Sequence, residues 1–255
     1  ILFGVINYFI YKVPNSSLWV NNSFIKKDRY AKSINSTKIV FTSGSNTLFG
    51  TETHLIEDYF HIPTVNMAIH AGLKTDYILY RAKKILNSGD TIIVPLEYSN
   101  ITWNGEQSDT RRDYILTHDK NFYKNEMSIK DKLLMLFTID PLQLLKSIKQ
   151  QYFVAIKEPE PGKGYSSVSL NKNGDHMYKK GRKETMFIPN LHKPIKLEYD
   201  FTGDEKGLED IKKFSIWCKN NNINFFMTFP NTISHKEYFE EPYLSYFNHL
   251  MNYFN

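Results

Sequence analysis

Short apolar runs alternate with amphipathic stretches in two parts of the chain. Each run holds several β-branched or aromatic residues in succession. Such runs are typical of strands that are buried on both faces. The alternation predicts an α/β fold: a doubly wound, mainly parallel sheet of the flavodoxin-like type, with the first strand in the centre. The predicted strands are residues 38–42, 64–69, 91–96 and 224–229.

The stretches between these runs have helical spacing. In one of them, Ile78, Leu79, Ala82, Ile85 and Leu86 fall on a single stripe of a helix. The pattern therefore predicts that helices connect the strands and that an amphipathic helix follows the last one. The predicted helices are residues 51–60, 75–87, 205–221 and 236–254.

The alternation stops between residues 100 and 204, where charged residues, Asn and Gly are frequent. One strong helical stretch runs from residue 127 to 156. Pro141 breaks it, and Asp140 can cap a second helix that has the proline at its first position. Residues 166–183 look irregular. We interpret 100–204 as a largely helical insertion into an α/β domain of residues 38–255, lying over the carboxyl end of the sheet.

Residues 1–11 are almost wholly apolar, and Lys12 closes the run. Eleven residues are too few to cross a bilayer, which takes about 20. A run that begins at the first residue is nevertheless compatible with the end of a longer one. We therefore expect residues 1–37 to be the remnant of a membrane anchor and a polar connector, with the domain outside the cytoplasm. The alternative is a core helix or an edge strand.

The net charge is +5 and the lysines are scattered, so nothing favours nucleic acid as a partner. Cys218 is the only cysteine, which excludes an internal disulfide and leaves the compartment open. Its helical context predicts a small buried apolar residue. Aromatic residues make up 15% of the chain, and a few of them could stack on sugar rings in a cleft.

Small polar residues follow the first predicted strand at once, among them Gly44-Ser45-Asn46. A strand, a tight turn and a helix place Ser45 at the carboxyl end of the strand, where ligands and nucleophiles of open α/β sheets lie. The amino end of the helix also offers unpaired N–H groups to a developing oxyanion. The alternative is an ordinary turn with a Ser or Thr cap.

Together with Gly72, Glu97 and Asn100 after the next two strands, this turn resembles the SGNH/GDSL hydrolase superfamily. The similarity covers residues 38–98 and 205–235. It is strongest to the extracytoplasmic, membrane-anchored branch that acylates or deacylates cell-envelope polysaccharides, as in alginate acetylation and teichoic-acid D-alanylation. The resemblance implies that Ser45 is the nucleophile. It also implies that the N–H groups of Ser45 and Gly72 and the Asn100 amide form the oxyanion hole.

The chain departs from that family in its acid–base block, Asp-x-x-His after the last strand. The only such spacing here is Asp58 to His61, which lies in a predicted helix and is treated as a decoy. His235 is the one histidine after the fourth strand that is expected on the face where the base is needed, and no Asp stands three residues before it. Either the base lies beyond this chain, or the protein is not a complete catalyst.

Other candidates change the picture little. His54, Asp58 and His61 could present zinc ligands on one helix face, but an ordinary solvated helix face is favoured. Residues 171–175, NKNGD, resemble the start of a calcium loop, but an Asn-Gly turn is favoured because the closing Glu is missing. The spacing of Gly44 and Gly50 does not fit a phosphate loop. We expect no metal and no cofactor.

The sequence thus predicts a serine-dependent esterase or O-acyltransferase that acts on an extracytoplasmic glycan. Its partners would be a polysaccharide or an acylated small molecule, and a membrane protein that donates the acyl group. Asn46, His70 and Glu97 are further binding candidates, since each lies near the end of a predicted strand. The alternative is a non-catalytic carbohydrate-binding or scaffold protein of an envelope-polymer assembly.

Overall fold

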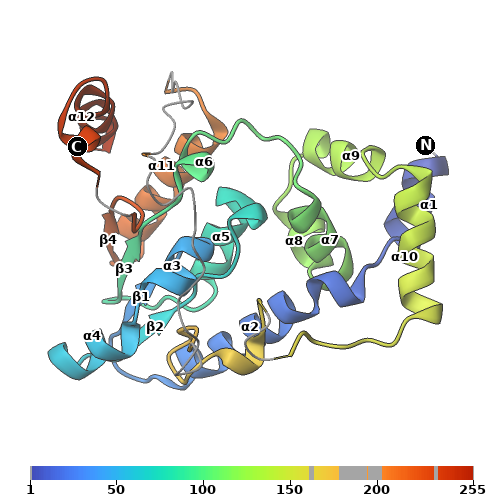
Figure 1. Ribbon diagram of the computed structural model, residues 1–255, viewed down its shortest axis with the longest axis horizontal. Coiled ribbons are helices and arrows are strands. Elements are labelled where there is room, and N and C mark those ends of the chain that lie inside the picture. Colours follow the sequence, from blue (N-terminus) through green and yellow to red (C-terminus); the bar gives the residue numbers. More distant parts are fainter. Residues whose placement is uncertain (1, 161–163, 178–193, 195–202, 233–234, 255) are drawn as a thin grey trace.

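The computed structural model describes residues 2–160, 164–177, 194, 203–232 and 235–254 (Figure 1). Its centre is a sheet of four parallel strands in the order β2-β1-β3-β4. The predicted fold class, the parallel pairing and the central place of the first strand are confirmed. The strands are β1 (Ile39–Phe41), β2 (Thr64–Asn66), β3 (Thr91–Val94) and β4 (Asn224–Met227).

The strand register places branched side chains next to each other in the core. Val40 of β1 pairs with Val65 of β2 and with Ile92 of β3, and all three are fully buried. β2 is buried at every position, whereas β1 and β3 alternate buried with partly buried residues and β4 alternates partly buried with exposed ones. The expected burial on both faces therefore holds for β2 alone. Cys218 is also fully buried, as expected.

Helices surround the sheet (Figure 1). The expected helix 51–60 is present as α4, and a short additional helix, α3, precedes it; the two are separate because the chain is extended at Thr51. The last expected helix is divided into a 3-10 turn and a helix. The elements are α3 (Ser45–Gly50), α4 (Thr53–Phe60), η1 (Ala71–Leu73), α5 (Lys74–Lys83), α6 (Tyr98–Ile101), α11 (Lys206–Asn220), η3 (Lys236–Phe239) and α12 (Tyr243–Phe254).

Six further helices form a second part of the molecule beside the sheet (Figure 1). The expected cap at Asp140 is present: its side chain accepts from the Gln143 N–H, and Pro141 opens the helix. These helices are α1 (Leu2–Ile10), α2 (Pro14–Ser33), α7 (Asp109–His118), α8 (Lys120–Asn125), α9 (Ile129–Phe137) and α10 (Pro141–Phe153).

The segment that we expected to be a polar connector forms the 20-residue helix α2. Trp19, Val20, Phe24 and Ala31 lie on one side of it and are buried. α2 packs against α7 and α10 of the insertion and against β2 of the sheet, so it joins the two parts of the molecule. Within the described residues, no helix combines the length and the apolar character needed to cross a membrane.

The insertion reaches the carboxyl end of the sheet through α7, which packs against η1 directly after β2. Of its other helices, α8 packs against α7, α9 packs against α1, and α10 packs against α1 and α2. Of the segment expected to be irregular, residues 166–177 form the 3-10 turn η2 (Ser167–Ser169) and a tight turn. Residues 178–183 lie outside the described residues.

Candidate functional site

Ser45 is the first residue of α3 and follows β1 closely, as the pattern of strand, turn and helix predicted. The turn is possible because residue 44 is a glycine. A Cβ atom at Gly44 would lie 2.5 Å from the backbone nitrogen of Ala71 and would also collide with the Glu97 carboxylate. The close approach of these two segments therefore brings the ends of β1, β2 and β3 together around Ser45.

The Glu97 carboxylate holds this turn from the end of β3. It accepts the N–H of Gly44 at 3.1 Å and the N–H of Asn46 at 3.1 Å. The hydroxyl of Ser43 lies 3.1 Å from the same carboxylate and 2.7 Å from the Pro95 carbonyl oxygen. Hydrogen bonds to a charged acceptor are about twice as strong as neutral ones. Glu97 is thus a positioning residue for the Ser45 turn.

The Ser45 side chain itself is partly exposed, and its hydroxyl has no hydrogen-bond partner among the residues that the structure describes. Ser43, two positions earlier, is buried and fully engaged. The turn therefore presents one serine outward while it uses the other for its own stability.

His70 lies at the carboxyl end of β2, beside this turn. Its Nδ1 accepts the N–H of Gly72 at 2.9 Å, so Nδ1 carries no proton. Burial lowers the pKa of His70, and the nearby charge of Glu97 only partly opposes this. The ring is therefore neutral with its proton on Nε2, and it offers a hydrogen-bond donor there rather than a base.

Two of the expected oxyanion donors are already engaged. The Gly72 N–H is bound to His70, as just described. Asn100 is fully buried on α6, and its Nδ2 donates to Glu97 Oε2 at 3.2 Å. The third binding candidate, Asn46, donates its side-chain amide to the Asn231 carbonyl at 2.6 Å. These side chains fix the architecture around Ser45 in the described structure.

His235 precedes the 3-10 turn η3, and its ring packs against Tyr238 with centroids 5.3 Å apart. In the described part of the chain, neither this histidine nor any other makes a hydrogen bond to the Ser45 hydroxyl. The geometry thus gives the serine a fixed position and places no base on it.

A cluster of aromatic rings lies next to His70. Tyr165 stacks on Trp19 of α2 with centroids 4.6 Å apart, and it lies 5.1 Å from Phe49 of α3 and 5.6 Å from His70. Tyr165 and Phe49 are partly exposed. No local pattern reveals this cluster, because its members come from four separate segments of the chain and lie 21 to 146 residues apart (70 minus 49, 165 minus 19).

A second histidine is paired with a carboxylate away from Ser45. His54 Nδ1 lies 3.0 Å from Asp175, which is buried and also accepts the Thr53 hydroxyl at 2.7 Å. Burial acts to raise the pKa of Asp175, but the bonds from Thr53 and His54 outweigh it and hold that pKa below its ordinary value. His54, a candidate zinc ligand from its spacing in the sequence, is therefore part of a structural hydrogen-bond network.

Asp175 ends the expected Asn-Gly turn, in which Gly174 has φ +93°. In place of a calcium loop, the turn seals the edge of the sheet: Asn173 accepts the N–H of Asn66 on β2 at 2.8 Å. His61, the histidine of the Asp58–His61 spacing, follows α4 in a left-handed conformation and is exposed. Nowhere in the described residues do three or more His, Cys, Asp or Glu side chains form a group that could hold a metal.

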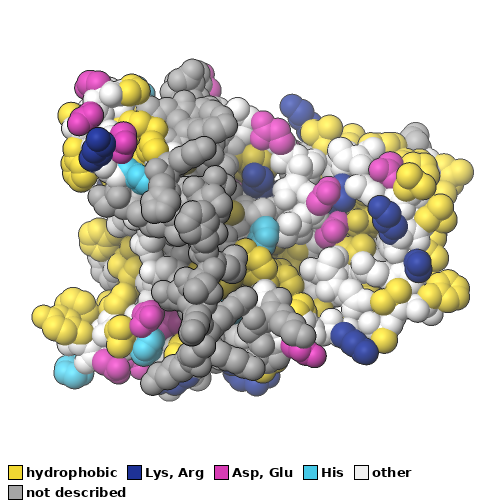
Figure 2. Space-filling view, in the orientation of Figure 1, with side chains coloured by type: hydrophobic (Ala, Val, Ile, Leu, Met, Phe, Trp, Pro, Cys, Tyr) yellow, Lys and Arg dark blue, Asp and Glu magenta, His cyan; other side chains and the backbone are white. Residues whose placement is uncertain are grey.

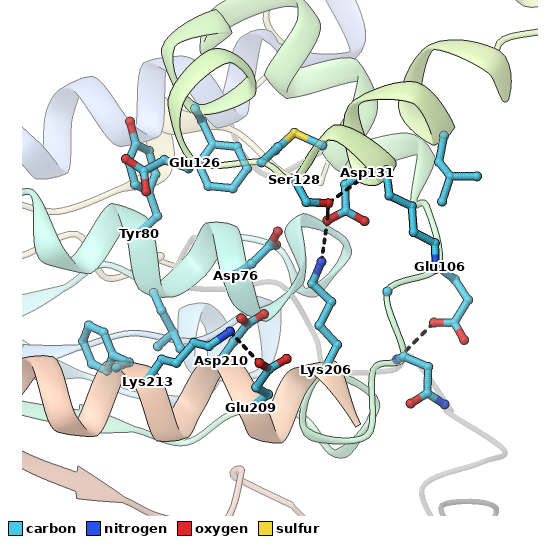
Figure 3. A pocket seen from close by; sticks show the side chains of 18 of the residues that line it. Asp76, Tyr80, Glu106, Glu126, Ser128, Asp131, Lys206, Glu209, Asp210 and Lys213 are labelled. Carbon is cyan, nitrogen blue, oxygen red and sulfur yellow. Dashed lines mark hydrogen bonds and ion pairs between the residues drawn. The ribbon is translucent and has the colours of Figure 1, made fainter. Parts of the chain in front are cut away.

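A large concavity lies elsewhere, between α5, the start of α9 and α11, with a volume of about 800 Å³ (Figure 3). Asp76 and Asp210 both line it, and Arg111 donates two hydrogen bonds of 3.1 and 2.5 Å to Asp76. Burial, and then the charge of Asp76, raises the pKa of Asp210 to about 7. Ser45 and Glu97 are absent from its lining, so it is separate from the candidate nucleophile.

Comparison with known proteins adds nothing to this geometry: the chain matches no protein-family model, no curated protein and no solved structure.

Proposed function

We propose that this protein is a serine-dependent esterase or O-acyltransferase of the SGNH type that acts on a glycan outside the cytoplasm. One observation carries the proposal. The Ser45 hydroxyl is partly exposed and has no hydrogen-bond partner within the described part of the chain, and it lies at the start of a helix directly after the central strand of a parallel sheet. Reactive groups of open α/β sheets lie at this edge.

In this mechanism, the Ser45 oxygen attacks the acyl carbon and the carbonyl oxygen gains negative charge. The Ser45 N–H at the head of α3 and the Nε2–H of neutral His70 supply donors for that charge. His70 thus takes the place that the resemblance gives to Gly72 and Asn100. The Ser45 proton must pass to a base outside the described residues, for which the resemblance implies a histidine oriented by an aspartate. The adduct then breaks its bond to the alcohol of the substrate, which leaves with that proton. Water, or the hydroxyl of an acceptor sugar, finally attacks the acyl carbon and releases Ser45.

The aromatic cluster supports a sugar as the substrate. Phe49 and Tyr165 are partly exposed beside His70, and flat aromatic faces pack well against the apolar faces of pyranose rings. In the acyltransferase form of the proposal, a membrane protein supplies the acyl group.

Covalent labelling tests the nucleophile. A serine-directed fluorophosphonate should modify the protein at Ser45, and Ser45→Ala should abolish the adduct in intact-mass and peptide mass spectra. Ser215→Ala on α11 is the matched control, because Ser215 is also partly exposed and should not affect labelling. Unchanged labelling of the Ser45→Ala variant would exclude Ser45 as the nucleophile.

A second candidate, a non-catalytic glycan-binding protein, is favoured by a specific observation. The Gly72 N–H and the Asn100 amide, both expected in an oxyanion hole, are bonded to His70 and Glu97. Such a protein would bind an acetylated oligosaccharide without turning it over. Equal affinity of the wild type and Ser45→Ala in calorimetry, together with no fluorophosphonate adduct, would select this function over the first.

A further inference from the structure

Three helices form a fixed layer at the end of the molecule farthest from the sheet (Figure 1). α1 lies between α9 and α10. Asn7 of α1 is buried and donates its side-chain amide to the Leu136 carbonyl of α9 at 2.8 Å. On the other side, Gln151 of α10 donates to the Ile10 carbonyl at 2.9 Å. The polar groups of α1 are thus turned inward, toward its neighbours.

The outer side of this layer is apolar, and Figure 2 shows hydrophobic side chains along that edge of the molecule. We call it the apolar face and define it by six side chains that are between 62% and 79% exposed. Soluble proteins rarely expose so much apolar surface in one place unless it binds something. The six residues are Leu2, Phe9, Ile129, Leu142, Leu145 and Phe153.

A groove of about 470 Å³ continues the apolar face between α1 and α9. Val5, Phe9 and Phe137 are among the residues that line it, and Lys124 and Lys132 border it as well. An apolar floor with ammonium groups beside it suits a molecule that carries both a hydrocarbon chain and a negative charge.

The charges around the apolar face point the same way. α1 contains no charged residue, whereas α9 and α10 together contain four lysines and one aspartate, which gives +3 (four minus one). That aspartate, Asp131, is turned away and is bonded to Lys206 at 2.7 Å. Lys130 lines the other concavity beside Asp131, which leaves the three lysines Lys132, Lys146 and Lys149 on these helices. A second copy of this chain would bring the same lysines against each other, whereas an anionic surface complements them.

From these observations we propose that the apolar face docks on the surface of an anionic lipid bilayer. α1, α9 and α10 lie along the interface, the exposed apolar side chains enter the boundary of the acyl chains, and the lysines contact lipid phosphates. This inference goes beyond the proposed function and does not depend on it, because Ser45 and its surroundings take no part in the docking.

Vesicle co-sedimentation tests the docking with the whole chain. The protein should bind vesicles of phosphatidylcholine mixed with phosphatidylglycerol, and binding should weaken as salt screens the lysines. Phe153→Glu should weaken it by about tenfold, because a buried apolar contact becomes a repelled charge. The matched control is Tyr59→Glu on α4, which has the same exposure of 79% and lies at the opposite end of the molecule. It should leave binding unchanged.

The electrostatic part has its own pair of variants. Lys146→Glu with Lys149→Glu should weaken binding to the anionic vesicles, whereas Lys219→Glu on the exposed side of α11 should not. Equal binding of Phe153→Glu and the wild type would overturn the proposal. So would the absence of any binding to anionic vesicles, or a dimer in sedimentation equilibrium that Phe153→Glu dissociates, which would make the face an interface between copies.

Discussion

The two ends of the sheet neutralise a carboxylate in different ways. At the amino end, Asp90 binds the ammonium group of Lys38 at 2.6 Å, and both side chains are at most 1% exposed. Asp90 also accepts the N–H groups of Lys38 and Asn87. At the carboxyl end, Glu97 has no lysine or arginine partner among the described residues and binds the N–H groups of the Ser45 turn instead.

This difference assigns the stabilising contacts to the amino end of the sheet and the accessible Ser45 side chain to the carboxyl end. A buried ion pair locks two strands together and leaves nothing free for a ligand. A carboxylate that binds peptide groups shapes a turn without covering the side chain at its tip, so Ser45 stays available. The amino end should therefore dominate the unfolding free energy, and the carboxyl end should dominate any chemistry.

The largest effect should come from Lys38→Met. Asp90 would remain buried without its counter-ion, and we expect a loss of about 4 kcal/mol in the free energy of unfolding, measured by urea denaturation. Lys219→Met, at an exposed site, should change it by less than about 0.5 kcal/mol. If Lys38→Met were no more destabilising than that control, the amino end would not be the stabilising one.

Glu97→Gln should cost about 2 kcal/mol, because the bonds from Gly44 and Asn46 lose their charged acceptor. It should also slow fluorophosphonate labelling of Ser45, since the turn is no longer held. Glu126→Gln, at an exposed position, serves as the control in both measurements. Unchanged labelling in a destabilised Glu97→Gln variant would show that the turn keeps its geometry without this carboxylate.

Asp210 should make the free energy of unfolding depend on pH. Its pKa is raised from 3.8 to about 7, so the folded state holds the proton more tightly than the unfolded state. The contribution of Asp210 to stability is therefore full below about pH 4 and is lost as the pH rises to about 7. Asp210→Asn should stabilise the protein by about 1.5 kcal/mol at pH 8, after allowance for partial exposure, and by nothing at pH 3.

Urea denaturation at several pH values checks this, with Asp204→Asn at an exposed site as the control. A gain for Asp210→Asn that does not change with pH would contradict the linkage.

The smallest effect should come from Ser45→Ala, within about 0.5 kcal/mol of the wild type, because its hydroxyl makes no hydrogen bond to any residue that the structure describes. Ser43→Ala removes a buried hydroxyl that is bonded to the Pro95 carbonyl, and it should cost about 1.5 kcal/mol. Thermal unfolding of the two variants compares neighbours in one turn. A larger cost for Ser45→Ala would mean that its side chain is structural.

The strands could be predicted because short runs of branched and aromatic residues are typical of buried strands, as around Val40 and Ile92, which are fully buried. Helix α2 could not, because its buried side includes Ser17, Ser23 and Lys27 and so looks polar in the sequence. Lys27 is buried only because its ammonium group donates to the Ala68 carbonyl at 2.5 Å, a partner 41 residues away.

Part of the candidate site was likewise accessible from the sequence. The place of Ser45 follows from its strand, turn and helix, which are local signals. The role of Glu97 as the acceptor of the Gly44 N–H depends on a contact across 53 residues, and the pair of His54 and Asp175 on one across 121. Such pairings depend on the tertiary fold, so the local sequence around each residue does not predict them.

The position of α1 between α9 and α10 has a consequence for synthesis. Asn7 and its partner Leu136 are 129 residues apart in the sequence. At the usual pace of translation, α1 leaves the ribosome roughly ten seconds before the helices that cover its inner side. During this interval, both sides of a strongly apolar helix are uncovered, and a chaperone or a membrane surface competes with α9 and α10 for it.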